Sequence, residues 1–329
     1  MKKVISLILL ASLVLTLTGC LRKNYSAEIS GNYVDNRYHN SLAGARVVRI
    51  GDALYFLHSK NQSRVIKLTA DGSEQMINDG TALYPRLFRV GEWDGDLYVA
   101  DGQTHVYDAA TGEMRSIPEH LTTVAEEIWM NDRVIDGFVY YLHYEKVEDI
   151  PYYSLRRADL TTGEIETLVS NMEQACYIAQ DAVYFTRKEG ERSLYKYDLT
   201  TGTFRLLTEN IPSDGYAKLF MEGDELLLWV EHEIFRINLA GECTLSSLPA
   251  KGHQYILNTC EGSVYYNDDG SFYRYDLTTG EIVPLCENSV WSCYIVDDRW
   301  VYYYTDEHEY SILWRVSQDG AVTEMVYGG

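Results

Sequence analysis

The sequence predicts an all-β fold, a seven-bladed β-propeller made of four-stranded antiparallel blades. The first observation is a repeat marked by turn glycines, which lie 39 or 40 residues apart except for one interval of 51. The second is that short apolar and aromatic runs of strand length lie between these glycines. The third is that no helical period of useful length follows the first twenty residues. The turn glycines are Gly72, Gly112, Gly163, Gly202, Gly241, Gly280 and Gly320.

Each copy of the repeat has the same succession of elements. One strand joins an apolar residue to a tyrosine in six of the seven copies, as in Val264-Tyr265, and such residues suit a pleated, mostly buried surface. The next strand alternates apolar and polar residues and has a basic residue near its end, as in Phe272–Tyr275. The next segment, from Asp276 to Gly280, is expected to form a turn. The Asp side chain can hydrogen-bond to the local backbone, and Gly accepts a positive φ. A fourth short strand completes the copy.

The repeat also sets the expected domain boundaries. The propeller spans residues 41–329, after a signal peptide at 1–19 and a polar linker at 20–40. A single copy cannot bury both faces of its sheet, so the copies must stack around an axis. Closing the ring leaves few open sheet edges. The ring needs a latch, and Ile29–Val34 is a candidate edge strand for it.

The N-terminus predicts export. Lys2 and Lys3 precede an apolar run, Val4–Leu17, which ends in the tetrad Leu17-Thr18-Gly19-Cys20. A charged start, an apolar segment and a small-residue cleavage site form a secretory signal peptide. The tetrad resembles a bacterial lipobox, which implies a lipid on the Cys20 thiol and cleavage before Cys20. We therefore expect a lipoprotein anchored to a bacterial membrane, at the cell surface or facing the periplasm. The alternative is an ordinary signal peptide with a chance cysteine.

The net charge limits the classes of partner, and the cysteines limit the possible disulfides and metal sites. The formal net charge of −21 argues against nucleic acid, whose phosphates would be repelled, and against adsorption onto anionic headgroups. Apart from Cys20, five cysteines remain, and Cys286 and Cys293 either form a disulfide or stay reduced within strands. No CxxC or CxxH spacing exists, so the sequence predicts no metal site.

The last copy carries a family resemblance. Val301-Tyr-Tyr-Tyr-Thr-Asp306 is followed by Ile312-Leu-Trp-Arg315 and by Asp319-Gly320. This succession resembles the Tyr-Trp-Thr-Asp, Ile-x-Arg and Asp-Gly motifs of the YWTD propellers of low-density-lipoprotein-receptor-related proteins and of similar bacterial lipoproteins. The resemblance implies the fold and no common activity. This chain departs from the pattern, since Tyr-Tyr or Tyr-Phe replaces Tyr-Trp in most copies.

A second resemblance concerns the turns. Asp-x-x-Thr-Gly turns are similar to those of quinoprotein-type propellers, in which a tryptophan stands four residues after the glycine. Here those positions are occupied by Ser116, Thr167, Leu206 and Pro284. The sequence therefore predicts no quinone and no other cofactor.

Two features suggest a ligand-binding face. The long third copy adds the segment His143–Tyr153 between two strands; it is either a functional face loop or a hairpin extension. An aromatic residue also tends to begin the innermost strand of each blade, near one mouth of the channel. The alternative for these rings is packing between blades. The candidate face residues are Tyr84, Trp129, His143, Tyr177, Tyr216, Tyr255 and Tyr294.

The sequence shows no catalytic motif of the HExxH or GxSxG type, and we assign no catalytic residue. We expect a lipid-anchored, extracytoplasmic, non-catalytic binding or scaffolding module for a cell-envelope protein, peptide or glycan. One alternative is an enzyme acting on glycans or peptides through carboxylates at the channel mouth. Another is a subunit of an envelope assembly. The basic residue before each turn is expected to pair with the turn aspartate or with a carboxylate of the neighbouring blade.

Overall fold

The computed structural model describes residues 47–59, 63–77, 86–89, 97–100, 104–108, 111–116, 118–127, 130–147, 150–189, 191–212, 215–230, 233–247, 254–305 and 311–328. Within these residues the strands form seven four-stranded sheets. The expected all-β class and the four-stranded antiparallel units are confirmed. Cys20, Tyr84, Trp129 and the candidate latch Ile29–Val34 lie outside the described residues.

Numbered in chain order, the first three sheets contain β1 (Val47–Ile50), β2 (Ala53–Ser59), β3 (Ser63–Leu68) and β4 (Glu74–Met76); β5 (Arg86–Arg89), β6 (Leu97–Ala100), β7 (Thr104–Tyr107) and β8 (Met114–Ser116); β9 (Met130–Ile135), β10 (Phe138–Val147), β11 (Ile150–Asp159) and β12 (Ile165–Met172). Sheets 4 and 5 contain β13 (Cys176–Ile178), β14 (Ala182–Glu189), β15 (Glu191–Asp198) and β16 (Thr203–Ile211); β17 (Ala217–Glu222), β18 (Glu225–Val230), β19 (Glu233–Asn238) and β20 (Cys243–Ser247). Sheets 6 and 7 contain β21 (Gln254–Cys260), β22 (Ser263–Asp268), β23 (Ser271–Asp276) and β24 (Ile282–Cys286); β25 (Val290–Ile295), β26 (Trp300–Thr305), β27 (Leu313–Ser317) and β28 (Thr323–Tyr327).

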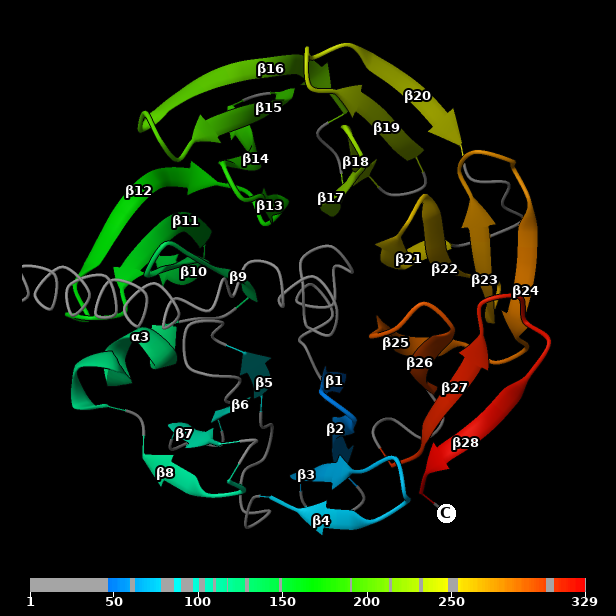
Figure 1. The fold of residues 1–329 in the computed structure, drawn as a ribbon. Coiled ribbons are helices and arrows are strands. Elements are labelled where there is room, and N and C mark those ends of the chain that lie inside the picture. The colour runs from blue at the N-terminus through cyan, green and yellow to red at the C-terminus, as the bar shows by residue number, and fades with distance from the viewer. Residues whose placement is uncertain are drawn as a thin grey trace, which may run out of the picture. The chain divides into compact units, whose positions relative to one another are not determined.

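Every described sheet is an antiparallel meander of strands that are consecutive in sequence. The sheets follow one another around a ring, with the first strand of each innermost and the fourth outermost (Figure 1). This arrangement is that of a β-propeller. A short 3-10 helix, η3 (Glu119–Leu121), and a helix, α3 (Thr122–Glu127), precede the third sheet. No helix in the described residues is long and apolar enough to cross a membrane.

The core lies between neighbouring sheets. The middle strand β26 is buried along its whole length, because other sheets cover both of its faces. One apolar cluster joins sheet 4, through Tyr184, to sheet 5, through Leu228. Another joins sheet 1, through Phe56, to sheet 7, through Tyr302. Apolar contacts between facing sheets therefore hold sheet 4 to sheet 5 and sheet 1 to sheet 7.

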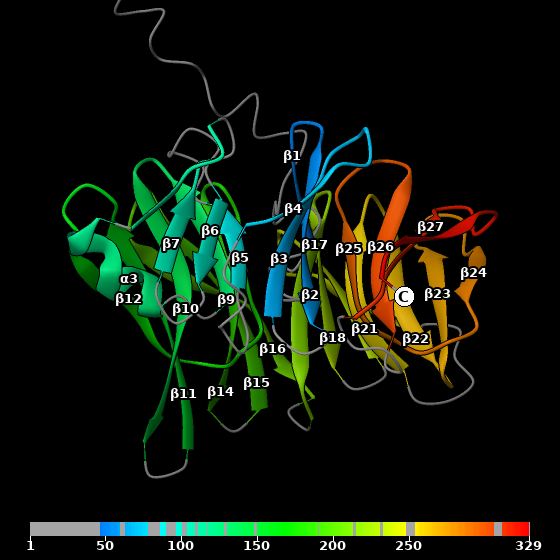
Figure 2. The ribbon, with the colours of Figure 1, turned by 90° about the horizontal axis from the view of Figure 1, so that it is seen from below.

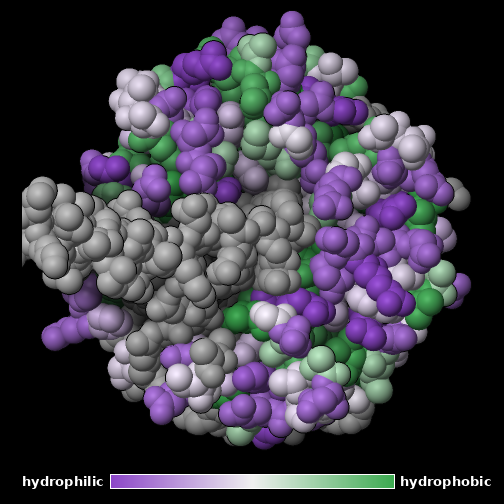
Figure 3. Space-filling model, in the orientation of Figure 1, coloured by the Kyte–Doolittle hydropathy of each residue, from purple (hydrophilic) through white to green (hydrophobic). Residues whose placement is uncertain are grey.

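The long third copy is a hairpin extension. Strands β10 and β11 pair residue by residue from Phe138↔Asp159 to Val147↔Ile150. This hairpin projects beyond the other sheets on one side of the ring (Figure 2). The segment His143–Tyr153 is thus mostly paired strand, not an irregular face loop. On the face of the described sheets shown in Figure 3, hydrophilic residues predominate, in keeping with the net charge of −21.

The glycine turns have the conformation that the repeat predicts. All seven turn glycines have a positive φ, between 68° and 96°. Asp276 accepts hydrogen bonds from the N–H groups of Thr278 and Thr279, and the same bonds recur at Asp159 and Asp198. Local side-chain capping of this kind stabilises the turn without an ion pair.

The sequence predicts that the basic residue before each turn pairs with the turn aspartate or with a carboxylate of the neighbouring blade. For Arg157 and Arg315 this prediction is wrong. Arg157 Nε donates to Glu166 Oε2 at 2.8 Å, and Arg315 Nε donates to Glu324 Oε2 at 2.9 Å. Both pairs join facing residues of adjacent strands within one sheet. The turn aspartates are engaged by backbone N–H groups, so the guanidinium groups reach the nearest cross-strand carboxylate instead.

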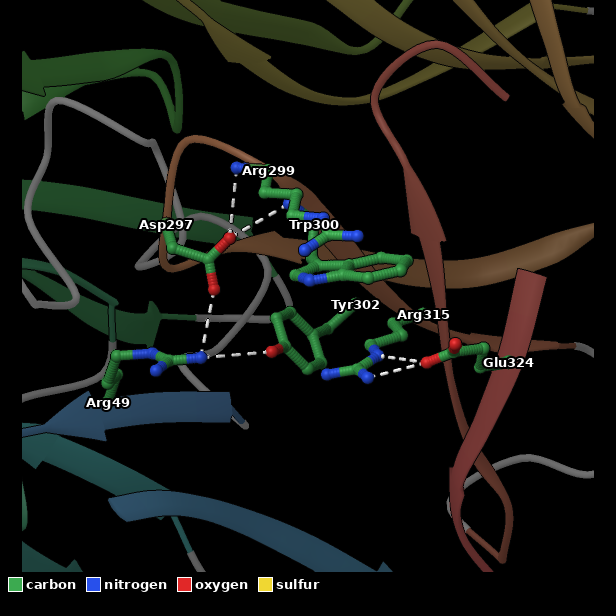
Figure 4. A network of polar contacts seen from close by, with 7 residues as sticks. All are labelled: Arg49, Asp297, Arg299, Trp300, Tyr302, Arg315 and Glu324. Atoms are coloured by element: carbon green, nitrogen blue, oxygen red, sulfur yellow. Dashed lines mark hydrogen bonds and ion pairs between the residues drawn. The ribbon is translucent and has the colours of Figure 1, made fainter. Parts of the chain in front are cut away.

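Side chains, and not a shared sheet, join the first described sheet to the last. Arg49 of β1 donates to Asp297 at 2.9 Å and to the hydroxyl of Tyr302 at 3.1 Å (Figure 4). Asp297 Oδ1 also accepts from the backbone N–H of Trp300 at 2.8 Å. The Tyr304 hydroxyl donates to the carbonyl of Leu57 at 2.5 Å. These bonds lie beside the apolar cluster that the two sheets share.

Candidate ligand-binding site

An aromatic cluster lies where the innermost strands of sheets 5 and 6 begin. Tyr216 precedes β17, Tyr255 is the second residue of β21, and Trp229 belongs to β18. The indole of Trp229 meets both rings edge to face, with centroids 6.4 Å from Tyr216 and 5.5 Å from Tyr255. Trp229 is buried, whereas Tyr216 and Tyr255 are 43% and 44% exposed. We call these three residues the Tyr216–Trp229–Tyr255 cluster.

A lysine lies beneath this cluster. Lys218 faces Trp229 directly across the β17–β18 pair and is only 9% exposed. Its Nζ donates to the carbonyl of Ile256 at 2.8 Å and lies 4.2 Å from the centroid of the Tyr255 ring. The register of β21 shifts beside Ile256, and such a bulge leaves a backbone group without its ladder partner. Lys218 satisfies that carbonyl and makes a cation–π contact at the same time.

Burial shapes the ionisation of the site. It lowers the pKa of the Lys218 amine to about 8, because a low dielectric disfavours the charged form. It also raises the pKa of Tyr216, with smaller contributions from the hydroxyls of Tyr255 and Tyr153. Tyr153 pairs with Tyr144 in the projecting hairpin β10–β11, so that part of the hairpin lies near the cluster. The buried Nε1 of Trp229 has no hydrogen-bond acceptor among the described residues.

A buried arginine fixes the segment that leads into Tyr216. Arg192 is 2% exposed and forms a two-pronged ion pair with Glu173, at 2.7 and 3.0 Å. It also donates to the carbonyls of Pro212 and Gly215, at 2.8 and 3.0 Å. Because a buried guanidinium with four hydrogen bonds holds its partners firmly, Tyr216 starts from a fixed backbone position. Such positioning reduces the entropy lost when a ligand binds.

The other predicted aromatic residues do not join the cluster. Tyr177 is buried among the residues that join sheets 4 and 5. Tyr294 is fully buried between sheets 7 and 1, where its ring packs edge to face on Tyr304. For these two rings, the structure matches the alternative interpretation of packing between blades. Of the predicted rings that the structure describes, only Tyr216 and Tyr255 lie together and exposed.

His143 belongs to a separate polar cluster. The carboxylate of Glu127, at the end of α3, accepts from the Tyr141 hydroxyl at 2.9 Å and from Arg156 at 2.7 Å. His143 Nδ1 lies 3.7 Å from the same oxygen. Burial and then Arg156 lower the pKa of His143, against the opposing effects of Glu127 and Glu145. These contacts tie α3 to β10 and β11.

Metal ligands and thiols add no second site among the residues that the structure describes. No group of three or more His, Cys, Asp or Glu side chains that could hold a metal ion occurs in the described stretches. Cys286 and Cys293 are not joined to each other in the structure, and both thiols are free. The Tyr216–Trp229–Tyr255 cluster with Lys218 can stack on a flat apolar surface and donate hydrogen bonds beside it.

Sequence reasoning missed Trp229 and Lys218. Both stand within apolar strand segments, where an aromatic or a basic residue is unremarkable. Only the β17–β18 register and the bulge in β21 bring them beneath Tyr255.

Comparisons with known proteins support the fold. No protein-family model matches the chain, and no curated protein sequence matches it. Among solved structures, oligogalacturonate lyase from Vibrio parahaemolyticus is 12% identical at a TM-score of 0.52, over 84% of this chain and 85% of that one. Acylaminoacyl peptidase from Pyrococcus horikoshii is 14% identical at a TM-score of 0.53, over 84% of this chain and 49% of that one.

TolB from Acinetobacter baumannii is 16% identical at a TM-score of 0.45, over 83% of this chain. The chain spans 63% of the length of that protein. Oligogalacturonate lyase and TolB are β-propeller proteins. At identities of 12% and 14%, the lyase and the peptidase indicate the fold class alone. This chain is therefore an all-β protein of the β-propeller type.

Proposed function

We propose that this chain is a lipid-anchored, extracytoplasmic β-propeller that binds a cell-envelope ligand at the Tyr216–Trp229–Tyr255 cluster. One observation carries this proposal: two half-exposed tyrosine rings pack edge to face on a buried tryptophan, and one of them, Tyr255, covers the amine of the buried Lys218. Exposed aromatic rings held in fixed positions are typical of surfaces that bind ligands, since they bury much area at a low entropic cost. The protein acts as a binding module and not as an enzyme.

The seven described sheets are the complete set of blades in this proposal. The spacing of the turn glycines supports this count, since each of the seven lies between the third and fourth strands of one sheet. We also propose that the chain is related to the YWTD-type bacterial lipoprotein propellers. The hydrogen-bonded pair Arg315–Glu324, at the basic position of the motif, supports that relation.

The anchor is the lipid on Cys20, and residues 20–40 link it to the propeller at 41–329. Labelling cells with an alkyne fatty acid tests this directly. Wild-type protein is expected to carry the label and to fractionate with membranes, whereas Cys20→Ala is expected to lack the label. Label on Cys20→Ala, or unlabelled wild-type protein, would contradict the anchor and leave the ligand site untouched.

The ligand site is tested with the soluble propeller on an array of envelope glycans and peptides. Tyr216→Ala and Tyr255→Ala are expected to weaken binding about tenfold each, because each removes one stacking surface. Tyr152→Ala is the matched control, since Tyr152 is also exposed, at 36%, and lies on β11. Binding that survives both site substitutions, or no binding to any member of the array, contradicts the proposed site.

A further inference from the structure

We infer that Lys218 is the specificity-determining residue of this site and that the ligand is an acidic glycan, a sugar chain that carries a carboxylate. The inference rests on the proposed function, because it assumes that ligands bind at the Tyr216–Trp229–Tyr255 cluster. It adds the chemical class of ligand, which follows from the position of one buried cation and the kind of surface around it.

The amine of Lys218 retains unused hydrogen-bonding capacity. A lysine ammonium has three N–H donors and no acceptor. Within the described residues, Lys218 donates to a single oxygen, that of Ile256, and forms no ion pair with a carboxylate. The other contact of its Nζ is the face of the Tyr255 ring. Tyr255 is 44% exposed, so the amine lies beside a side chain that meets solvent.

Among the described residues, no anion that faces Lys218 balances its charge. From β25 it faces the thiol of Cys293, whose pKa is raised by burial, so the thiol is neutral. From β21 it faces the neutral phenol of Tyr255. On its own strand, Glu222 lies at the far end, where its carboxyl group binds the N–H of Gly262 and where burial raises its pKa. A cation held in a low dielectric without a counter-ion is unfavourable, and a ligand carboxylate supplies that counter-ion.

The surface around the amine favours a sugar over a peptide as the carrier of the charge. The two exposed tyrosine rings offer flat apolar faces with hydroxyls at their rims, which suits a pyranose ring with apolar C–H faces and polar edges. An acidic peptide side chain supplies the carboxylate without a flat ring to stack. The net charge of −21 repels anions in general, so an anionic ligand needs a local cation, and Lys218 is placed to provide it.

The test uses matched disaccharides that differ in one group. One ends in glucuronic acid, and the other ends in glucose with the same linkage. Titration calorimetry of the soluble propeller is expected to show the acidic sugar binding at least tenfold more tightly. Lys218→Met is expected to remove this preference, because a charge-assisted hydrogen bond is lost. Lys218→Arg, which keeps the charge, is expected to keep part of it.

Lys196→Met is the matched control. Lys196 also lies over a tyrosine ring, at 5.9 Å from the centroid of Tyr184, and it belongs to sheet 4. Its removal changes the net charge equally and is expected to leave the preference for the acidic sugar unchanged. If Lys196→Met loses the preference as Lys218→Met does, then general charge decides binding and the inference is overturned.

A second measurement needs no variant. Because the pKa of Lys218 is about 8, a bound carboxylate is expected to draw a proton onto the amine above that pH. Binding enthalpies measured at pH 8.5 in two buffers of different ionisation enthalpy then reveal uptake of a fraction of one proton. At pH 6 the amine is already charged, so no uptake is expected. Equal results at the two pH values would overturn the role of Lys218 even if Lys218→Met fails to fold.

The outcomes separate the inference from the proposed function. Equal binding of the acidic and neutral sugars, lost in Tyr255→Ala, overturns the acidic class and leaves the aromatic site standing. Tighter binding of a glutamate-rich peptide than of the acidic sugar overturns the choice of a glycan. Binding of neither sugar, nor of any other acidic glycan on the array, overturns the inference. If the array also contains no other ligand that depends on Tyr216 or Tyr255, the proposed function fails with it.

Discussion

Arg49 of β1 and Asp297, in the turn after β25, form an ion pair of 2.9 Å that joins the first and last described sheets (Figure 4). The same Arg49 nitrogen donates to the hydroxyl of Tyr302 at 3.1 Å. Each described sheet is made from consecutive strands, so no main-chain ladder in these residues crosses from β1 to sheet 7. The cohesion of that junction therefore depends on side chains, namely these polar contacts and the apolar cluster beside them.

Removing Arg49 is expected to loosen this junction selectively. Arg49→Met eliminates the ion pair and the bond to Tyr302, and we expect a loss of about 1 kcal/mol in the free energy of unfolding. We also expect faster amide hydrogen exchange in β1 and β25. Arg157→Met is the control, because its partner Glu166 lies in the same sheet. Unchanged exchange in β1, or equal acceleration there in the control, contradicts this account.

The turns could be predicted from the sequence because their chemistry is local. An aspartate and a glycine a few residues apart specify capped, positive-φ turns without help from the rest of the chain. The partners of Arg157 and Arg315 could not be predicted in this way. Which carboxylate each guanidinium reaches depends on the cross-strand register, and the register of the fourth strands contains shifts that the sequence does not reveal.

The candidate site was only half predictable for a similar reason. Tyr177 and Tyr216 read alike in sequence, as aromatic residues at the start of an innermost strand. Tyr177 lies within β13 and is buried, whereas Tyr216 stands just before β17 and is exposed. A shift of one position reverses the direction of a side chain and a shift of two restores it, so the place of a ring relative to the strand start does not decide its burial. Tyr255, like Tyr177, is the second residue of its strand, yet it is exposed. Lys218 reaches its place through a bulge in another sheet, which no local pattern encodes.

Two of the turn glycines should differ in their tolerance of alanine. Gly280 has a φ of 74° and open space around it, so Gly280→Ala is expected to cost about 1–2 kcal/mol for the left-handed backbone alone. Gly320 has a φ of 72°, and a Cβ there would lie 2.6 Å from the carbonyl oxygen of Pro284 in the preceding sheet. Gly320→Ala is therefore expected to cost distinctly more, by about 1–3 kcal/mol. Urea unfolding of the two variants decides this, and equal losses would show that the turn does not press on the neighbouring sheet.

The buried amine of Lys218 predicts a pH-dependent difference in stability. Burial lowers its pKa from 10.5 to about 8, so between these values the unfolded state holds a proton that the folded state lacks. Stability then rises with pH in this window. We expect the free energy of unfolding of the wild type to gain on that of Lys218→Met from pH 8 to pH 10 and to show a constant difference below pH 7. A difference that is flat from pH 7 to pH 10 would mean that the amine is not desolvated.

The buried carboxyl group of Glu222 predicts the opposite pH dependence of stability, at acid pH. Burial raises the pKa of its carboxyl group above the ordinary 4.5, with the N–H of Gly262 partly opposing the shift. As pH rises through 4.5, the unfolded state releases its proton first, so the wild type loses stability until the folded pKa is passed. Glu222→Gln keeps an oxygen for Gly262 and cannot ionise, so we expect it to be more stable than the wild type at pH 7. The advantage should vanish below pH 4, where both side chains are neutral. Thermal unfolding of Glu222→Gln and the wild type across this pH range measures the advantage. Glu281→Gln, on an exposed turn, is the control. An advantage of Glu222→Gln that persists at pH 3.5 would show that the amide gains from packing and not from the absence of charge.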